Sequence, residues 1–251
     1  MTNTARKFLQ EDAWCRGCKG TSLSQIGEKD GFALLRCADC KTVVVNPYPL
    51  DAELMAYYQQ YRKTGEYLGK KDSKLRRAKG RAKAILAQKP PGKKFLDVGC
   101  SVGFVVASAT QLGCEATGID IDHDVINVAN REFAGQGAFK AVSVQDLAAS
   151  GEKFDMVYSS EVVEHVRDPE DFIAAIAGVM NKGAVLYMTA PDGNHFGVPK
   201  NFATWPMVCP PEHLTFFSRK GITALLARHG LKAEKFQLAL KPGLKVFARK
   251  A

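Results

Sequence analysis

Four cysteines near the start of the chain have the spacing of metal ligands. They form two C-x2-C pairs with eighteen residues between the pairs, at Cys15, Cys18, Cys37 and Cys40. Thiolates are preferred ligands of Zn²⁺, and two such pairs can complete a tetrahedron around one ion. A turn signal at 29–31 and a short apolar strand at 32–36 lie between the pairs. The spacing therefore predicts a small structural zinc ribbon, with a pair of redox motifs or an iron–sulfur cluster as the alternatives.

A second group of residues suits nucleotide binding. Asp97 precedes a glycine-rich turn at 99–103, and together they read D-x-G-x-x-x-G. The G-x-G-x-x-G fingerprint of dinucleotide-binding enzymes fails twice there, because Ser101 and Phe104 occupy glycine positions. A carboxylate at this place suits the cationic amino group of an amino-acid-bearing nucleotide and would repel a pyrophosphate. We therefore expect S-adenosylmethionine as the cofactor.

Two further acidic residues extend this pattern along the chain. Asp120 ends the next predicted strand, where its carboxylate can accept hydrogen bonds from both hydroxyl groups of a ribose. Asp146 follows the third strand and could accept a hydrogen bond from an adenine amino group. The carboxyl ends of parallel strands share one edge of a sheet. We therefore expect the three acidic side chains to line one ligand site.

A third candidate group is the E-x-x-E-H element at 161–165, which follows another predicted strand. Its last residue, His165, is our first candidate for a general base, since imidazole is the side chain most often used in that role. We expect Glu161 and Glu164 to share one side of a helical turn with it, and His213 could complete a divalent metal site. The alternative is that Glu164 and His165 make structural hydrogen bonds and bind no metal.

These residues need a scaffold, and the chain from residue 93 onward alternates strands with helices. Five strands are predicted, at 94–98, 115–120, 138–142, 154–159 and 184–189. Two helices have clear start signals: Asp168 precedes a proline and two acidic residues, and Ser218 precedes an apolar stretch that stops at Gly230. This alternation predicts a doubly wound α/β sheet, whose ligands bind at the carboxyl ends of the strands.

The patterns divide the chain into three segments: a zinc-ribbon module at 1–50, a helical linker and acceptor-side cap at 51–92, and a cofactor-binding domain at 93–251. A ribbon of this length cannot build a sufficient core, so metal binding should supply much of its folding free energy. The cap begins with a tyrosine-rich helix at 51–61. The long segment 190–217 should form a lid over the acceptor pocket, and its aromatic residues could stack on the acceptor or anchor the loop.

Four stretches, FLDVGCSVG, GIDID, VQDL and FDMVYSSEVVEHVRDP, closely resemble the class I S-adenosylmethionine-dependent methyltransferases over roughly residues 93–251. The resemblance implies a Rossmann-like sheet of seven strands whose last strand, 245–249, is antiparallel between its neighbours. It also implies cofactor contacts from Asp97, Gly99, Ser101, Gly103, Asp120, Ile121, Asp146 and Leu147. Glycine is commonest at the position of Ser101, and a small residue there should still admit the cofactor.

Two less specific likenesses concern the acceptor. The cysteine-rich ribbon, the N-P-x-P exit and the tyrosine-rich helix together resemble bacterial methyltransferases of glycan or secondary-metabolite synthesis, whose acceptor is often a sugar hydroxyl or carbon. The E-x-x-E-H element resembles metal-binding elements of small-RNA 2'-O-methyltransferases and an element of ubiquinone-biosynthesis O-methyltransferases. These likenesses imply a small-molecule or RNA acceptor and leave a second divalent metal open.

Composition limits the partners. The 251 residues have a net charge of +9, with 46% apolar and 24% charged residues, as in ordinary globular proteins. Basic residues concentrate at 62–83, a face that could attract RNA or phosphate groups. We expect no membrane insertion and, without a signal peptide, a cytoplasmic protein. We therefore expect methyl transfer to a sugar or metabolite, which could be nucleotide-linked; the alternatives are an RNA methyltransferase and a non-catalytic cofactor-binding protein.

Overall fold

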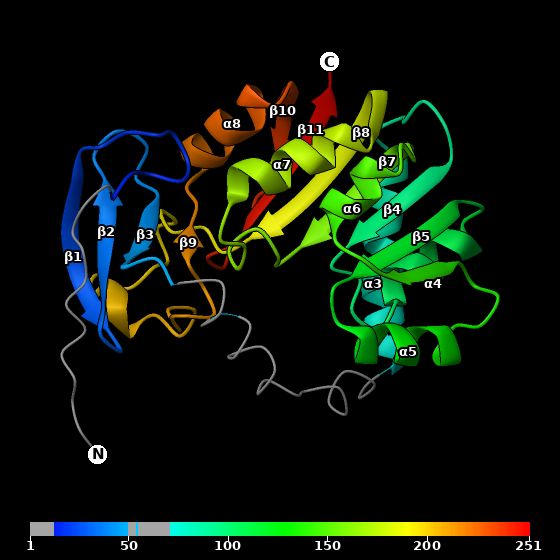
Figure 1. Cartoon of the computed structure of the whole chain (residues 1–251), viewed down its shortest axis with the longest axis horizontal. Coiled ribbons are helices and arrows are strands. Elements are labelled where there is room, and N and C mark those ends of the chain that lie inside the picture. The colour runs from blue at the N-terminus through cyan, green and yellow to red at the C-terminus, as the bar shows by residue number, and fades with distance from the viewer. Residues whose placement is uncertain (1–12, 50–53, 55–70) are drawn as a thin grey trace.

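The computed structural model describes residues 13–49, 54 and 71–251. In this part of the chain a seven-stranded sheet flanked by helices lies beside a smaller, four-stranded sheet (Figure 1). The predicted tyrosine-rich helix at 51–61 lies outside the described residues except for Leu54, as does the 62–70 part of the basic stretch.

The larger sheet has the strand order β10-β11-β8-β7-β4-β5-β6. Its strands are β4 (Lys94–Val98), β5 (Glu115–Asp120), β6 (Ala138–Ala141), β7 (Phe154–Ser160), β8 (Met180–Ala190), β10 (Leu231–Phe236) and β11 (Leu244–Lys250). Strands β4 to β8 pair in parallel, whereas β11 is antiparallel to both β8 and β10. The predicted doubly wound sheet, with an antiparallel last strand between its neighbours, is confirmed.

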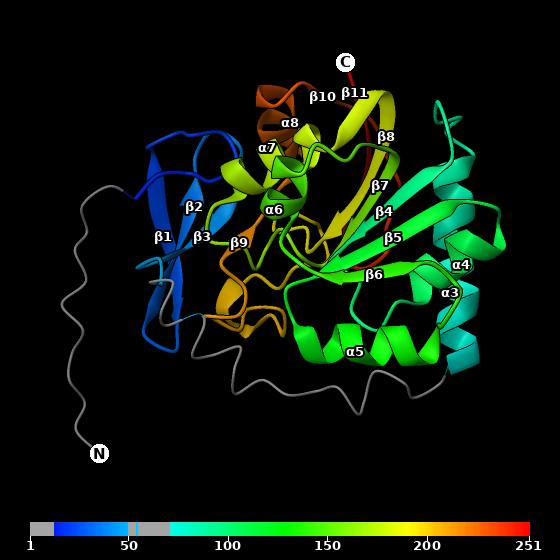
Figure 2. The same cartoon turned by 45° about the vertical axis from the view of Figure 1, so that its right-hand side comes forward.

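Helices cover both faces of this sheet (Figure 1, Figure 2). One face carries α3 (Lys71–Leu86), α4 (Phe104–Gln111) and α5 (His123–Glu132), and the other carries α6 (Val144–Ala149), α7 (Pro169–Gly178) and α8 (Arg219–Arg228). Each face of the sheet forms an apolar core with its helices. Side chains alternate along β4, so Phe95 packs in the core beneath α3, α4 and α5, and Leu96 packs in the core beneath α6, α7 and α8. Asp168 and Ser218 cap α7 and α8 by accepting hydrogen bonds from backbone N–H groups, as predicted.

The smaller sheet joins segments that are far apart in the chain. It contains β1 (Leu23–Lys29), β2 (Phe32–Cys37), β3 (Val43–Asn46) and β9 (Thr215–Phe216), in that order and antiparallel throughout. Strand β9 belongs to the segment 190–217, which also contains a short 3₁₀ helix, η1 (Phe202–Thr204). The sheet that the sequence places within 1–50 is therefore completed by the predicted lid segment.

Two aromatic residues of this segment act as anchors. Phe202 and Trp205 are 1% and 5% exposed, and their rings pack edge to face. They share one apolar core with Leu34 and Val43 of the ribbon. Of the two interpretations of the aromatic residues in this segment, loop anchoring therefore holds for Phe202 and Trp205.

Helix α3 carries the described part of the basic stretch. Its apolar stripe faces the core, and its outer face exposes Arg76, Arg77, Lys79 and Lys83, whereas Arg81 flanks the stripe with its guanidinium 5.8 Å from the centre of the Tyr158 ring. The helix is amphipathic and covers α4, so its cations stand on the outer surface. Among the helices in the described ranges, none is long and apolar enough to cross a membrane.

Candidate functional site

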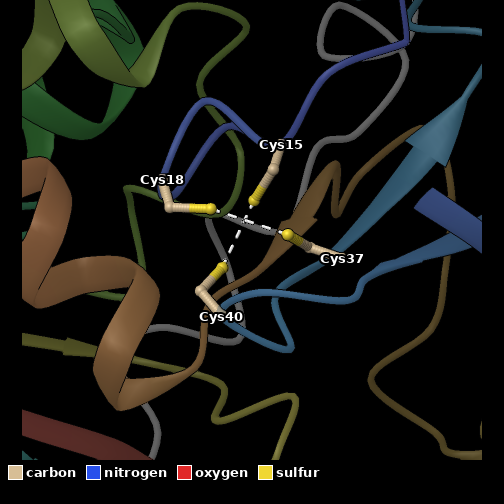
Figure 3. Close-up of side chains that lie close together, drawn as sticks. All are labelled: Cys15, Cys18, Cys37 and Cys40. Carbon is tan, nitrogen blue, oxygen red and sulfur yellow. Dashed lines mark hydrogen bonds between the residues drawn. The ribbon is translucent and has the colours of Figure 1, made fainter. Parts of the chain in front are cut away.

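The four cysteine side chains of the ribbon converge on one point (Figure 3). The sulfur atoms of Cys15 and Cys40 are 3.4 Å apart, and those of Cys18 and Cys37 are 3.5 Å apart. A tetrahedral zinc ion with Zn–S bonds of about 2.3 Å needs sulfur–sulfur distances of about 3.8 Å, which is close to this arrangement. The structure thus brings the predicted ligands together, and their geometry is compatible with a structural zinc ion.

Both C-x2-C pairs form the same backbone turn. The carbonyl oxygens of Cys15 and Cys37 accept hydrogen bonds from the N–H groups of Lys19 and Lys41, at 2.8 and 3.0 Å. Lys19 and Lys41 have φ angles of 65° and 68°, in the left-handed region that closes a tight turn. In the metal-free cluster the hydrogen bond between Cys15 and Cys40 lowers the pKa of the Cys40 thiol and raises that of Cys15, so the two sulfur atoms share one proton.

The glycine-rich turn after β4 is tightly built. Gly99 and Gly103 have φ angles of 78° and 89°, and a Cβ added to Gly99 would lie 2.4 Å from Val162 Cγ2. Ser101 also has a positive φ, 48°, and its N–H donates to the Asp120 carboxylate at 2.9 Å. The Ser101 hydroxyl is buried and has no hydrogen-bond partner among the described residues. The turn is therefore fixed to β5 and leaves one polar group for a ligand.

Asp97 and Asp120 lie near the carboxyl ends of the adjacent strands β4 and β5. Asp97 is 3% exposed, and burial, reinforced by the charge of Asp120, raises its pKa to about 8. Burial also raises the pKa of Asp120, although backbone N–H groups of Asp122 and Ser101 donate to its carboxylate. A cationic amino group beside Asp97 would compensate for the desolvation of its carboxylate. The site therefore fits the charge of S-adenosylmethionine.

The remaining predicted cofactor contacts have mixed surroundings. Ile121 directly follows Asp120 and is 68% exposed, so its side chain is open to a ligand. Leu147 is buried in the core beneath α6. Asp146 accepts a hydrogen bond from the Ser143 hydroxyl at 2.6 Å and forms a capping box at the start of α6. One of its carboxylate oxygens is thus engaged locally, and its contact with adenine stays a prediction.

Glu164, His165 and His213 form a second cluster, in which the possible ligand atoms all lie within 4.8 Å of one another. The Glu164 side chain is completely buried, and neither carboxyl oxygen has a hydrogen-bond partner in the described part of the chain. Burial, followed by the nearby charge of Glu161, raises the pKa of Glu164 well above its usual value. A buried carboxyl group without partners costs free energy unless something binds to it.

The backbone of this element differs from the prediction. Residues 163–165 form a turn and not part of a helix. Glu161 has a φ of 55°, which no helix tolerates, and its carboxylate accepts a hydrogen bond from the Thr189 hydroxyl at 2.8 Å. The expectation that Glu161 and Glu164 share one side of a helical turn is therefore wrong. Glu161 lies close to Glu164 but outside the group of three possible ligands.

Hydrogen bonds to backbone carbonyls show which nitrogen of each imidazole ring carries a hydrogen. His165 Nδ1 lies 2.9 Å from the Glu212 carbonyl oxygen, and His213 Nδ1 lies 2.6 Å from that of Met207. A carbonyl oxygen only accepts, so each Nδ1 carries a hydrogen, and the Nε2 of a neutral ring keeps a lone pair. Burial, followed by the charge of His213, lowers the pKa of His165 to about 4, so His165 is neutral at pH 7. The cluster offers two imidazole nitrogens and one carboxylate.

The donor set suits a divalent transition metal better than magnesium, which prefers an all-oxygen shell. Metal-binding histidines usually donate their other ring N–H to a carbonyl or carboxylate, as His165 and His213 do here. Sequence reasoning missed Met207 and Glu212 as orienting residues. Both act through backbone carbonyls, which every residue has, so their side-chain types give no signal.

Comparison with known proteins places the sequence among methyltransferases. Residues 69–235 match a family described as a methyltransferase domain. The ubiquinone biosynthesis O-methyltransferase of Hahella chejuensis is 36% identical over 116 residues, which are 45% of this chain and 47% of that protein. The enzyme of the same name from Sinorhizobium medicae is 33% identical over 100 residues, 39% of this chain and 40% of that protein. The chain thus spans less than half the length of these curated relatives.

Solved structures share the fold at low sequence identity. The magnesium protoporphyrin IX methyltransferase of Synechocystis PCC 6803, with bound SAH, is 18% identical with a TM-score of 0.57, covering 70% of this chain and 83% of that one. A TehB-like SAM-dependent methyltransferase from Corynebacterium glutamicum is 19% identical with a TM-score of 0.53, covering 80% of this chain and all of the other. At this identity the likeness shows a common fold.

Proposed function

The chain belongs to the class I methyltransferases, and from this premise we propose that it transfers the methyl group of S-adenosylmethionine to a small-molecule acceptor. The observation that carries the proposal is the pair of carboxyl groups of Asp97 and Asp120 beside the strained turn at 99–103. One carboxyl group is placed for a cationic amino group and the other for ribose hydroxyls. The unpartnered Ser101 hydroxyl lies between them in the sequence and supports a polar ligand in the turn.

We assign cofactor binding to the residues that the family pattern marks and assign the acceptor side to the second cluster. The cofactor residues are Asp97, Gly99, Ser101, Gly103, Asp120, Ile121, Asp146 and Leu147. The acceptor-side residues are Glu164, His165 and His213. The two groups are close in the fold, because β7, which ends just before Glu161, pairs directly with β4.

Methyl transfer is an in-line displacement, so alignment of the acceptor supplies much of the rate. The acceptor atom bonds to the methyl carbon while the carbon–sulfur bond breaks, and the electron pair of that bond leaves the sulfur as a neutral thioether. We assign removal of the proton from an acceptor hydroxyl to His165 Nε2, which lies 3.9 Å from Glu164 Oε1 on a side chain that is 22% exposed. Glu164 is completely buried, so it acts on an acceptor only through its neighbours.

The acceptor we propose is a hydroxyl group or carbon of a sugar or other metabolite, and a nucleotide-linked sugar would place its phosphates toward basic residues. The O-methyltransferase names of the curated relatives support a hydroxyl acceptor. A cytoplasmic location is part of the same proposal and rests on the sequence alone.

We also propose that Glu164, His165 and His213 bind a divalent metal. This assignment is supported by the two lone pairs on Nε2 and by the unpartnered carboxyl group of Glu164. A bound metal would supply Lewis acidity toward an acceptor oxygen. It would also occupy His165 Nε2, so the base and metal roles of His165 exclude each other. Zinc at the four cysteines has a structural role in this proposal.

Methyl-labelled S-adenosylmethionine, incubated with the full chain and fractionated cell extract, tests the function. We expect label in the small-molecule fraction, and much less label when Asp97→Asn replaces the wild-type chain at a cofactor concentration near the wild-type Kd. Label in RNA, lost steeply as salt rises, would support the RNA alternative that the exposed cations of α3 favour. Cofactor binding without transfer to any fraction would support the non-catalytic alternative.

A further inference from the structure

We propose that the zinc ribbon is a positioning part of the acceptor side of the site, which holds Glu164 and His213 in place through strand β3. The inference rests on the proposed function for the role of that cluster, but the contacts and their test do not depend on it. The predicted role of the cysteine motif is structural support of its own module. The contacts extend that role across the molecule.

The first connection runs through backbone hydrogen bonds. Val45, in β3, donates its N–H to the Leu214 carbonyl oxygen at 3.0 Å. Leu214 in turn donates its N–H to the Glu164 carbonyl oxygen at 2.8 Å, and the Thr215 N–H donates to the same oxygen at 3.3 Å. Leu214 directly follows His213. One residue thus links the ribbon strand to the turn that carries Glu164, and this residue is the neighbour of His213.

A second connection involves the exit of the ribbon. The Tyr48 hydroxyl hydrogen-bonds to the hydroxyl of the completely buried Thr215 at 2.8 Å. Arg16 lies between Cys15 and Cys18, and its guanidinium stacks over the Tyr48 ring, 4.3 Å from the ring centre. Arg167, three residues after Glu164, donates its Nε to the Pro49 carbonyl oxygen at 3.0 Å. The segments on both sides of the cluster of Glu164, His165 and His213 therefore contact residues 48 and 49, where the chain leaves the ribbon.

The second C-x2-C pair contacts the chain just after β9. The Ser218 hydroxyl donates to the Cys40 carbonyl oxygen, and the Ser218 N–H donates to the Thr42 hydroxyl at 3.3 Å. The contact is close, because a Cβ added to Gly221 would lie 2.0 Å from Thr42 Oγ1. A ligand of the predicted zinc ion is thus bonded through its own carbonyl to the start of α8.

Strand β9 needs this support. It has two residues, and in the sheet of described strands its neighbour is β3. So short a strand cannot hold its register alone, and the apolar core around it is shared with ribbon residues such as Leu34 and Val43. Because metal binding supplies much of the folding free energy of such a ribbon, loss of the ion from the thiolates should release β9 as well.

Hydrogen exchange of the full chain, with zinc bound and after chelation, tests the proposal without an activity assay. We expect the amides of Leu214 and Thr215 to exchange at least about tenfold faster after chelation, since a lost hydrogen bond is worth about 1 kcal/mol or more. The amides of β5 should keep their rates. Unchanged protection of Leu214 and Thr215, while the Cys37 amide of the knuckle exchanges freely, would overturn the proposal.

A pair of variants repeats the test with zinc in place. Thr215→Val removes the partner of the Tyr48 hydroxyl at nearly constant volume, and Thr215→Ser keeps it. We expect Thr215→Val to speed the exchange of the Leu214 amide by about tenfold and to leave the Kd for S-adenosylmethionine unchanged, with Thr215→Ser restoring the wild-type exchange rate. Gln25→Ala, on the exposed strand β1, is the control. Wild-type exchange at Leu214 in Thr215→Val would refute the positioning role even if the chain transferred no methyl group.

Discussion

Asp97 and Asp120 lie near the ends of neighbouring parallel strands, and the charge of Asp120 adds to the burial that raises the pKa of Asp97 to about 8. Asp97 therefore favours its protonated form at neutral pH in the cofactor-free chain, although the charge of Arg81 lowers its pKa in part. A cofactor with a cationic amino group favours the carboxylate, so binding and proton release are linked.

The first prediction is that cofactor binding releases a proton at Asp97. The affinity should rise as the pH approaches about 8 and fall at higher pH, because an α-amino group has an ordinary pKa of about 7.7–8.0 and then loses the positive charge that Asp97 binds. Asp97→Asn should weaken binding by about tenfold to a hundredfold, the range for a lost hydrogen bond to a charged group, and flatten the pH dependence. Calorimetry in two buffers of different ionisation enthalpy measures the proton count. Equal heats in both buffers at pH 7 would contradict the prediction.

The same pKa predicts how stability depends on pH. The carboxyl group of Asp97 has an ordinary pKa of 3.8 when exposed, and burial raises it to about 8. The folded state thus binds the proton more tightly, so this contribution to stability is complete below about pH 4 and is lost as the pH rises to about 8. In denaturant unfolding of the cofactor-free chain, the stability of Asp97→Asn relative to the wild type should increase as the pH rises from about 4 to about 8. A constant difference between the two proteins would refute the assignment.

The third prediction concerns the four cysteines. The purified chain should contain one zinc ion, and Cys37→Ala should remove it because three thiolates leave the tetrahedron open. Protease should then cut within the ribbon. Cys114→Ala is the control, since Cys114 is a buried thiol outside the cluster. Zinc content by mass spectrometry decides the matter, and a zinc content in Cys37→Ala equal to that of the wild type would exclude the site.

Local chemistry made much of the fold readable from the sequence. The C-x2-C spacing, the cap at Asp168 and the apolar strands each depend on neighbours a few residues away. The pairing of Val44 with Thr215 could not be predicted in this way, because it joins residues far apart in the chain and β9 has no strand pattern of its own. Strand β1 was missed for another reason: none of its side chains is buried, so no apolar alternation marks it.

The site was predictable to the same extent. Residue types and strand ends identified Asp97 and Asp120, whose roles depend on the edge of a sheet. The helical turn expected at Glu161 failed because a positive φ at a non-glycine residue has no sequence signature. The orientation of His213 depends on the carbonyl of Met207, and a backbone carbonyl is the same in every residue.

The fourth prediction is that the second cluster binds one divalent transition metal. Manganese titrated into chelated, zinc-reconstituted protein should give an electron paramagnetic resonance signal of bound ion, and Glu164→Gln should abolish it. Glu164→Gln should leave folding almost unchanged, because burial already favours the protonated, uncharged carboxyl group in the metal-free chain. Full methyl transfer in chelator, with no manganese bound by the wild type, would remove the metal and leave His165 free as a base.

The fifth prediction separates backbone strain from steric fit in the cofactor turn. Gly99 and Gly151 both have a φ of 78°, but an added Cβ would meet Val162 Cγ2 at 2.4 Å at Gly99 and nothing within 4 Å at Gly151. Gly151→Ala should therefore cost only about 1–2 kcal/mol, the penalty of a left-handed alanine. Gly99→Ala should cost about 1–3 kcal/mol more, because Val162 must move, and the displaced turn should lose cofactor affinity. Unfolding free energies and cofactor titrations of both variants measure this. The prediction fails if both variants lose the same stability and still bind the cofactor. In that case the backbone conformation of the turn determines its stability, and its packing against Val162 does not.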